Sequence, residues 1–247
     1  MSVALLVEYF EALPEDALQG IEDVPADRQY LHEPSSLPPP PTGGKAKRRA
    51  ALHLFNQKVR ERYLEGTLIR LSFSECALAR RAAVFALGQL GTLESNPPLA
   101  RCLHDTDGEI AELAAAAMRR VWFRGSGSSA SDQLYRIVRL SEAQQALLAL
   151  DQLIEKLPDF AEAYYQRAVF HYRSNQVDLA LRDCAQTVKL NPHHFAAQAG
   201  LGQCLLRLRR HNAALKAFRL ALRIHPRLEE IAATVRELES TQGEDGR

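Results

Sequence analysis

The chain has 247 residues, 46% of them hydrophobic and 25% charged, and its 31 Lys and Arg against 30 Asp and Glu leave a net charge of +1. This composition predicts a soluble protein with a large core, and the balanced charge argues against a protein organised wholly around nucleic acid or an acidic membrane. No apolar run reaches the roughly 18 residues that span a bilayer, and the first residues lack the basic start of a signal peptide, so we expect no membrane partner and a cytoplasmic location.

Residues 1–30 contain seven acids and a single Arg. Their pattern predicts a short acidic amphipathic helix before Pro14. Its apolar side consists of Val3, Leu6, Tyr9, Phe10 and Leu13. Two roles are open for this segment: it caps the helical stack that follows, or it is an intramolecular ligand of a groove elsewhere in the chain.

Residues 31–44 change composition sharply. Four consecutive prolines, 38–41, favour an extended polyproline conformation, and Gly43 and Gly44 follow them. We interpret 31–44 as a Pro/Gly linker.

The pattern from Lys45 to Arg124 is helical. The segment "TLIRLSFSECALARRAAVFALGQLG" (67–91) aligns with "PLARCLHDTDGEIAELAAAAMRRVW" (98–122) at an offset of 31 residues. These residues resemble the HEAT-like repeat family, which implies helical hairpins stacked into an α-solenoid. Glu109, Ile110 and Ala111 lack the arginine usual at the start of that helix, so the sequence departs here from the family's Asp–Arg ladder.

The segment "FRGSGSSAS" (123–131) interrupts the helical pattern, and a second period begins after it. Pro158, Pro192 and Pro226 stand 34 residues apart and define units 127–160, 161–194 and 195–228. The segments "AEAYYQRAVFHYRSNQVDLALRDCAQTVKLNP" and "LGQCLLRLRRHNAALKAFRLALRIHP" resemble the tetratricopeptide repeat family. The first unit, with "SDQLYRIVRL", lacks that family's aromatic residue and glycine.

Small and apolar residues recur in register where the two helices of each unit must touch. The equivalent positions are Ala146, Ala180 and Ala214, then Leu150, Cys184 and Phe218, then Leu153, Thr187 and Ala221. An apolar stripe after Pro226 predicts a helix that caps the open end. We therefore predict an all-α fold, an α-solenoid of antiparallel helical hairpins, with HEAT-like repeats at 45–124, tetratricopeptide repeats and cap at 127–240, and a polar tail at 241–247.

Catalytic motifs are missing from the sequence: it has no phosphate-binding glycine loop, no H-E-x-x-H and no G-x-S-x-G. The acids of "HDTDGE" (104–109) hint at calcium, but a helix-capping turn is preferred. For His171 we expect a packed imidazole, and for His193 and His194 a solvated turn. Four widely spaced cysteines, expected to be reduced core residues, are Cys76, Cys102, Cys184 and Cys204. We expect no enzyme activity, metal or cofactor.

Three arginines repeat with the 34-residue period and provide the candidate binding site. In a solenoid of hairpins the first helix of each pair lines the concave face, so equivalent positions form a ladder about 10 Å apart. Guanidinium groups beside apolar surface suit a peptide with carboxylates and an apolar anchor. The candidate peptide-binding residues are Tyr135, Arg139, Tyr165, Gln166, Val169, Tyr172, Arg173, Gln203, Leu206 and Arg207. The competing interpretation is that each arginine only compensates a helix dipole.

The best-known ligand mode of the tetratricopeptide family is a clamp on a C-terminal carboxylate, formed by Lys and Asn. The corresponding positions hold Tyr165, Val169 and Gly200, so an internal acidic or apolar segment is the expected ligand. We interpret the chain as a non-catalytic protein–protein interaction scaffold or adaptor that binds a peptide segment in the concave groove.

A nucleic-acid- or ribosome-associated protein is the alternative. Residues 45–70 carry a local excess of Lys and Arg that could meet phosphates. Phe55 and Tyr63 are expected in the core and not as a base-stacking platform. An enzyme, such as the chromophore lyases that some HEAT-like proteins resemble, ranks third.

Overall fold

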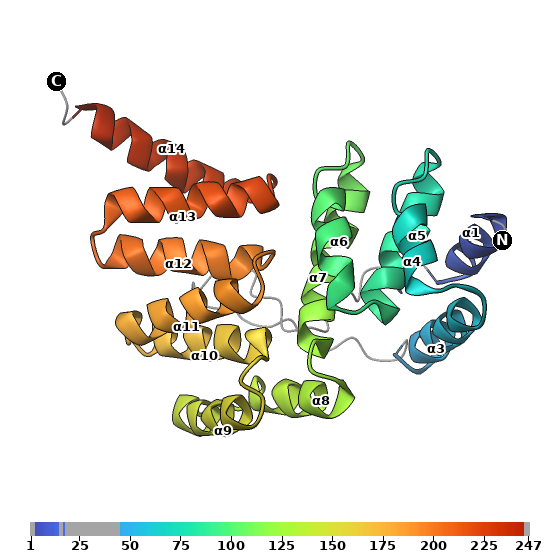
Figure 1. The fold of residues 1–247 in the computed structure, drawn as a ribbon, viewed down its shortest axis with the longest axis horizontal. Helices are drawn as coiled ribbons and strands as arrows, with labels where there is room; N and C mark the ends of the chain where they lie inside the picture. Colours follow the sequence, from blue (N-terminus) through green and yellow to red (C-terminus); the bar gives the residue numbers. More distant parts are fainter. Residues whose placement is uncertain (1–2, 15–16, 18–44, 245–247) are drawn as a thin grey trace. The chain divides into compact units, whose positions relative to one another are not determined.

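A computed structural model describes residues 3–14, 17 and 45–244, with side chains for 3–14, 17 and 47–240 (Figure 1). The linker predicted at 31–44 and much of the acidic segment lie outside these residues. Every regular element of the described part is helical, which confirms the all-α prediction. The chain divides into two compact units, and the boundary between them in the described sequence falls between Phe123 and Arg124. None of the described helices is both long and apolar enough to cross a bilayer.

The N-terminal unit consists of helices that range from 7 to 18 residues in length and one 3-10 turn. They are α1 (Val3–Glu11), α3 (Lys45–Arg62), α4 (Glu65–Leu71), α5 (Ala77–Leu90), the 3-10 turn η2 (Leu93–Ser95), α6 (Asn96–Cys102) and α7 (Gly108–Arg124). Helix α5 is buried on most sides because alanines let its neighbours approach. A Cβ on Gly88 would lie 2.9 Å from the Cβ of Ala117, so glycine permits the close approach of α5 and α7.

Helix α1 packs against α3 and α5. Leu6 and Phe10 are buried, and the ring of Phe10 meets that of Phe85 edge-on with centroids 5.6 Å apart. Phe55 of α3 meets the same Phe85 ring at 5.3 Å. This placement corresponds to the capping role for the N-terminal helix and not to the groove-ligand role.

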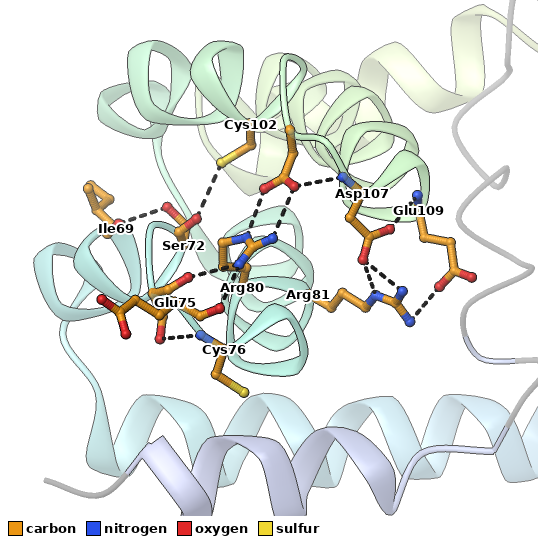
Figure 2. Close-up of polar contacts among 11 residues, drawn as sticks. Ile69, Ser72, Glu75, Cys76, Arg80, Arg81, Cys102, Asp107 and Glu109 are labelled. Atoms are coloured by element: carbon orange, nitrogen blue, oxygen red, sulfur yellow. Dashed lines mark hydrogen bonds and ion pairs between the residues drawn. The ribbon is translucent and has the colours of Figure 1, made fainter.

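Two arginines near the start of α5, Arg80 and Arg81, join the α4–α5 hairpin to the turn before α7 (Figure 2). The Arg80 guanidinium donates to both Asp105 carboxylate oxygens, at 2.8 and 3.1 Å, and to the Ser74 carbonyl at 3.0 Å. Arg81 contacts Asp107 at 2.7 Å. Arginines of α5 therefore pair with the acids of this turn, although the start of α7 itself lacks an arginine.

The C-terminal unit is a series of hairpins closed by one further helix (Figure 1). Its helices are α8 (Ser128–Ile137), α9 (Ala143–Lys156), α10 (Ala161–Arg173), α11 (Val177–Leu190), α12 (Phe195–Arg207), α13 (His211–Ile224) and α14 (Glu229–Glu244). We call α8, α10 and α12, which begin the hairpins, the inner helices, and α9, α11 and α13 the outer helices. Outer helices bury one face, whereas α10 and α12 bury residues on most sides.

The 34-residue register of small and large side chains forms the core of this unit. Ala146, Ala180 and Ala214 are fully buried, and so is Phe218. An added Cβ on Gly202 would lie 2.3 Å from the Phe218 ring, so only glycine lets α12 lie directly on α13. The repeat spacing thus corresponds to repeated helix contacts.

The turns between inner and outer helices share one backbone motif in the second and third hairpins. Asn175 and Arg209, 34 residues apart, adopt left-handed φ values of 62° and 57°. In each turn the next amide reaches five residues back, from Gln176 to the His171 carbonyl and from Arg210 to the Leu205 carbonyl, both at 2.8 Å. These are Schellman turns. The turn after α8 has no left-handed residue, and this difference accompanies the divergent sequence of the first unit.

Helix α14 covers the end of the last hairpin. It packs on α13, with Leu228, Ile231 and Val235 buried. Arg219 of α13 pairs with Glu239 of α14 at 2.6 Å. Most of the apolar stripe after Pro226 is thereby buried, and Leu238 is half-buried, as expected of a capping helix.

Candidate functional site

The predicted binding residues lie on the inner helices but differ widely in exposure. Tyr165, Gln166, Val169, Tyr172 and Gln203 are buried. Tyr135 and Leu206 are half-buried, whereas the three arginines of the 34-residue series are exposed. The arginines, which we call the ladder arginines (Arg139, Arg173 and Arg207), are therefore the solvent-accessible part of the set.

The ladder arginines occupy corresponding ends of the inner helices. Arg173 and Arg207 are the last residues of α10 and α12. Arg139 differs from the expectation, because α8 ends at Ile137 and Arg139 lies in the following turn. A helix C-terminus favours a cation within its last turn, so the dipole interpretation applies to Arg173 and Arg207 more directly than to Arg139.

Arg207 is held by the neighbouring hairpin. One of its terminal nitrogens donates to the Asn175 side-chain oxygen at 3.0 Å. The guanidinium carbon lies 5.0 Å from the centroid of the Tyr172 ring. Burial raises the pKa of Tyr172, and a hydrogen bond from Arg207 opposes this rise. The second and third hairpins thus place a cation, an amide and a phenol together.

Arg167, unlike the ladder arginines, pairs with carboxylates of two other helices of the C-terminal unit. Arg167 of α10 donates to both Asp183 oxygens of α11, at 2.8 and 2.7 Å, and to Asp151 of α9 at 2.7 Å. These hydrogen bonds, led by those to Asp183, raise the pKa of Arg167 further above its usual range. Because its charge is compensated by two carboxylates, Arg167 is a structural cation and not a candidate ligand group.

His194 corrects the expectation of a solvated turn. It is 1% exposed and is the N-cap residue of α12, where its Nδ1 accepts a hydrogen bond from the Ala197 amide at 3.0 Å. That acceptance requires the proton on Nε2, which lies 3.1 Å from a carboxylate oxygen of the buried Glu162. Gln166 donates to the other Glu162 oxygen at 2.7 Å.

The Glu162–His194 pair was missed because Glu162 is an ordinary first-turn acid in sequence. Only the 32-residue separation, close to one repeat, connects it with His194. A buried polar pair between consecutive inner helices explains why a histidine is tolerated there. His171 is more nearly as expected, since its Nδ1 contacts the Gln176 side chain at 2.7 Å and its ring is largely buried.

The acidic turn before α7 uses its carboxylates for the fold. Besides the Arg80 and Arg81 contacts, Asp105 accepts the Asp107 amide at 2.9 Å and Asp107 accepts the Glu109 amide at 3.0 Å. This is the helix-capping arrangement, which was preferred over calcium. The described residues contain no cluster of His, Cys, Asp and Glu suited to a metal ion.

Three cysteines are buried as expected, namely Cys102, Cys184 and Cys204, but Cys76 is exposed. Cys76 lies immediately before α5, and its side chain is exposed to solvent there. On α3, Lys47, Arg49 and Arg60 are exposed, while Phe55 of α3 and Tyr63 just after it are buried as predicted.

Comparison with known proteins supports tetratricopeptide repeats in the C-terminal unit. The family model described as Tetratricopeptide repeat matches residues 138–186 and 171–229. The chain is 26% identical over 126 residues to a TPR repeat-containing protein of Rhizobium etli. The aligned region covers 49% of this chain and 61% of that protein. The chain is 31% identical over 106 residues to the Protein SGT1 homolog of Homo sapiens, which covers 43% of this chain and 28% of that protein.

The chain thus spans less than two thirds of the length of either relative. The match to the family model includes the inner helices α10 and α12 and all three ladder arginines. Tetratricopeptide repeats and these relatives support a general role in protein–protein interaction. The HEAT-like interpretation of residues 45–124 stays a prediction.

Proposed function

We propose that this chain is a non-catalytic adaptor whose C-terminal unit binds a peptide segment along its inner helices. The carrying observation is that the ladder arginines are exposed where three successive inner helices end, Arg173 and Arg207 in the last turn and Arg139 two residues after α8. The preferred peptide carries several carboxylates and at least one apolar side chain. Peptide carboxylates would meet the ladder arginines, because guanidinium and carboxylate form paired, charge-assisted hydrogen bonds.

Charge compensation supports this assignment. Arg80, Arg167 and Arg219 each pair with a carboxylate of the fold. In the described part of the chain, neither Arg139 nor Arg207 forms an ion pair. Exposed cations contribute only about 0–1 kcal/mol each to stability, whereas several in a row can select and orient an acidic partner.

The N-terminal unit is proposed to be a HEAT-like segment of the same cytoplasmic adaptor. The contact of Arg80 with Asp105 supports this, since it connects one hairpin with the turn that precedes the next. The basic surface of α3 is kept as the nucleic-acid alternative, and no contact among the described residues favours it.

The test uses the full chain and a fluorescent pool of short peptides, each with several Asp or Glu and one Phe or Leu. The variant Arg139→Gln/Arg173→Gln/Arg207→Gln removes the ladder charges. A matched control, Arg182→Gln/Lys189→Gln/Lys216→Gln, removes three exposed cations from the outer helices α11 and α13. Both variants lose the same net charge, so a general electrostatic effect would change them equally.

We expect the ladder variant to bind the acidic pool at least about tenfold more weakly, equivalent to about 1.4 kcal/mol. The loss should be greatest at low salt, and the thermal midpoint should stay nearly unchanged. The outer-helix control should bind as the unchanged chain does. Equal binding by the two variants would refute the site and leave the helix-dipole interpretation.

A further inference from the structure

Positive charge concentrates in the third hairpin. Residues 184–228 contain no Asp or Glu, and three arginines fall within four positions at the turn from α12 to α13. Arg207, Arg209 and Arg210, which we call the arginine turn, are all exposed. The equivalent turn of the second hairpin, 173–176, carries only Arg173 as a charged residue. The cationic end of the ladder is therefore the third hairpin.

The described residues do not compensate the charge of the arginine turn. Structural arginines elsewhere have a carboxylate within 2.6–2.8 Å, as Arg80, Arg167 and Arg219 do. Among the residues that the structure describes, no member of the arginine turn forms an ion pair. Three neighbouring like charges repel one another, so the arrangement costs free energy unless an anion compensates it.

The backbone and one side chain of the turn are held in place before any ligand arrives. Two Schellman hydrogen bonds fix the backbone from which the Arg209 and Arg210 side chains extend. The Arg209 amide donates to the Leu206 carbonyl at 2.9 Å, and the Arg210 amide donates to the Leu205 carbonyl at 2.8 Å. Asn175 and the Tyr172 ring hold the Arg207 guanidinium. Such pre-organisation lowers the entropic cost of binding.

We propose that the arginine turn binds the phosphate group of a phosphorylated serine or threonine in the peptide that occupies the inner helices. A phosphoryl group carries about −1.5 to −2 charges and three strong acceptor oxygens near neutral pH. A cluster of guanidinium groups offers paired donors to those oxygens. A single carboxylate has one charge and two oxygens, and compensates such a cluster less completely.

The phosphate source is a peptide and not a nucleic acid for two reasons. Residues 205–212 contain no Phe, Tyr or Trp, and the nearby Tyr172 is buried beneath Arg207, so the turn exposes only the small imidazole of His211 and no larger ring for base stacking. Arg207 is also a ladder arginine, which makes the turn continuous with the proposed peptide surface. This inference rests on the proposed function and specifies the chemistry of one end of its ligand.

The experiment compares three fluorescent peptide pools with the same acidic and apolar flanks and one fixed central residue. That residue is phosphoserine, glutamate or serine, and anisotropy with the full chain gives each affinity. Arg209→Gln/Arg210→Gln tests the turn without altering the ladder residue Arg207. Arg182→Gln/Lys216→Gln, from the outer helices, removes the same charge elsewhere.

We expect the phosphoserine pool to bind at least about tenfold more tightly than the glutamate pool, as one further charge-assisted hydrogen bond predicts. The turn variant should lose this preference and the outer-helix variant should keep it. A further variant, Arg209→Gly, removes one charge while relieving the left-handed backbone. Weaker phosphoserine binding together with a higher thermal midpoint would show that the loss does not come from unfolding.

Other results overturn the inference in distinguishable ways. Equal affinity for phosphoserine and glutamate, with the ladder variant still weakening both, refutes phosphate recognition and leaves the proposed function. No binding of any pool refutes both. Binding of inorganic phosphate without a phosphoserine preference identifies an adventitious ion only. If polyuridylate RNA binds more tightly than the phosphoserine pool, and this binding depends on Arg209 and Arg210, the turn is assigned to nucleic acid instead.

Discussion

At the residue scale, the partners of each cation separate structural charges from candidate binding charges. Sequence periodicity located the ladder arginines, because the 34-residue spacing is visible without coordinates. It did not reveal that Arg167 lies between Asp183 and Asp151, since contacts across three helices depend on how the helices pack. The burial of His194 was missed for the same reason: its partner, Glu162, belongs to the preceding inner helix.

Arg209 stores backbone strain that a glycine would release. A non-glycine residue in the left-handed region costs on the order of 1–3 kcal/mol. Glycine removes this cost, but it loses more conformational entropy on folding, which offsets part of the stabilisation. We therefore expect Arg209→Gly to stabilise the C-terminal unit by about 0.5–1 kcal/mol. Urea unfolding followed by circular dichroism measures this.

Asn175→Gly is the matched comparison for Arg209→Gly. It should bring no such gain, because asparagine tolerates the left-handed conformation and its side chain accepts from Arg207. A loss of stability in Arg209→Gly would contradict the strain assignment.

The acidic turn of the N-terminal unit predicts a pH dependence. Burial raises the pKa of Asp105, but hydrogen bonds from Arg80 and the Asp107 amide outweigh it and lower the pKa overall. The Arg81 hydrogen bond lowers the pKa of Asp107. A lowered folded-state pKa gives stability that is complete above the unfolded Asp pKa of about 3.9 and is lost as the pH falls through the folded value.

Trp122 makes this dependence measurable. It is the only tryptophan in the chain and is buried in the N-terminal unit, where its Nε1 donates to Asn96. We expect Trp122 fluorescence to report an acid-unfolding midpoint of the N-terminal unit below about pH 4. The Asp105→Asn variant should be less stable at neutral pH, and its stability should depend less steeply on pH in the acid range. Asp159→Asn, an exposed turn acid of the other unit, should leave the Trp122 transition unaltered. An Asp105→Asn variant with the original pH profile would be inconsistent with the Arg80 pair.

At the element scale, the repeat pattern predicted which helices pair, and close packing determined the details. The small residues in register identified the contacts inside each hairpin, and the proline spacing identified the hairpin ends. The left-handed turn residues and the end of α8 before Arg139 were not predictable, because they depend on local hydrogen bonds. The role of α1 was left open by sequence, since either surface could have received its apolar side.

Glycine 202 tests the contact between α12 and α13. The Phe218 ring is fully buried and would lie 2.3 Å from an alanine Cβ at Gly202, so Gly202→Ala should destabilise the C-terminal unit by about 1–3 kcal/mol. Circular dichroism in urea gives the change.

Gly66→Ala in α4 is the matched control for Gly202→Ala. No atom lies within 4 Å of the added methyl group, so this variant should instead gain up to about 1 kcal/mol from helix propensity, detected by Trp122 fluorescence. A neutral Gly202→Ala would mean that the two helices can separate at no cost.

At the scale of the whole molecule, composition and periodicity predicted an all-α chain of hairpins, which the fold confirms. The identity of a ligand is not predictable in this way, because ladder positions vary on the surface without disturbing the core. The comparisons support interaction repeats over residues 138–229.

The C-terminal unit should fold by itself. Its hairpins pack on their neighbours in sequence, and α14 covers the last one. A Gly127–Ser240 fragment is expected to show a helical circular dichroism spectrum and a cooperative thermal transition. A coil spectrum would show that the unit depends on the rest of the chain.

The most direct test of the account is the affinity of this fragment for the acidic peptide pool, measured beside the full chain by fluorescence anisotropy. If the inner helices and ladder arginines form the binding surface, the fragment should bind with the same dissociation constant within about threefold, or roughly 0.7 kcal/mol. The Arg139→Gln/Arg173→Gln/Arg207→Gln change should weaken the fragment and the full chain equally. A folded fragment that fails to bind peptides captured by the full chain would contradict the account, because the binding surface would then lie outside the tetratricopeptide repeats.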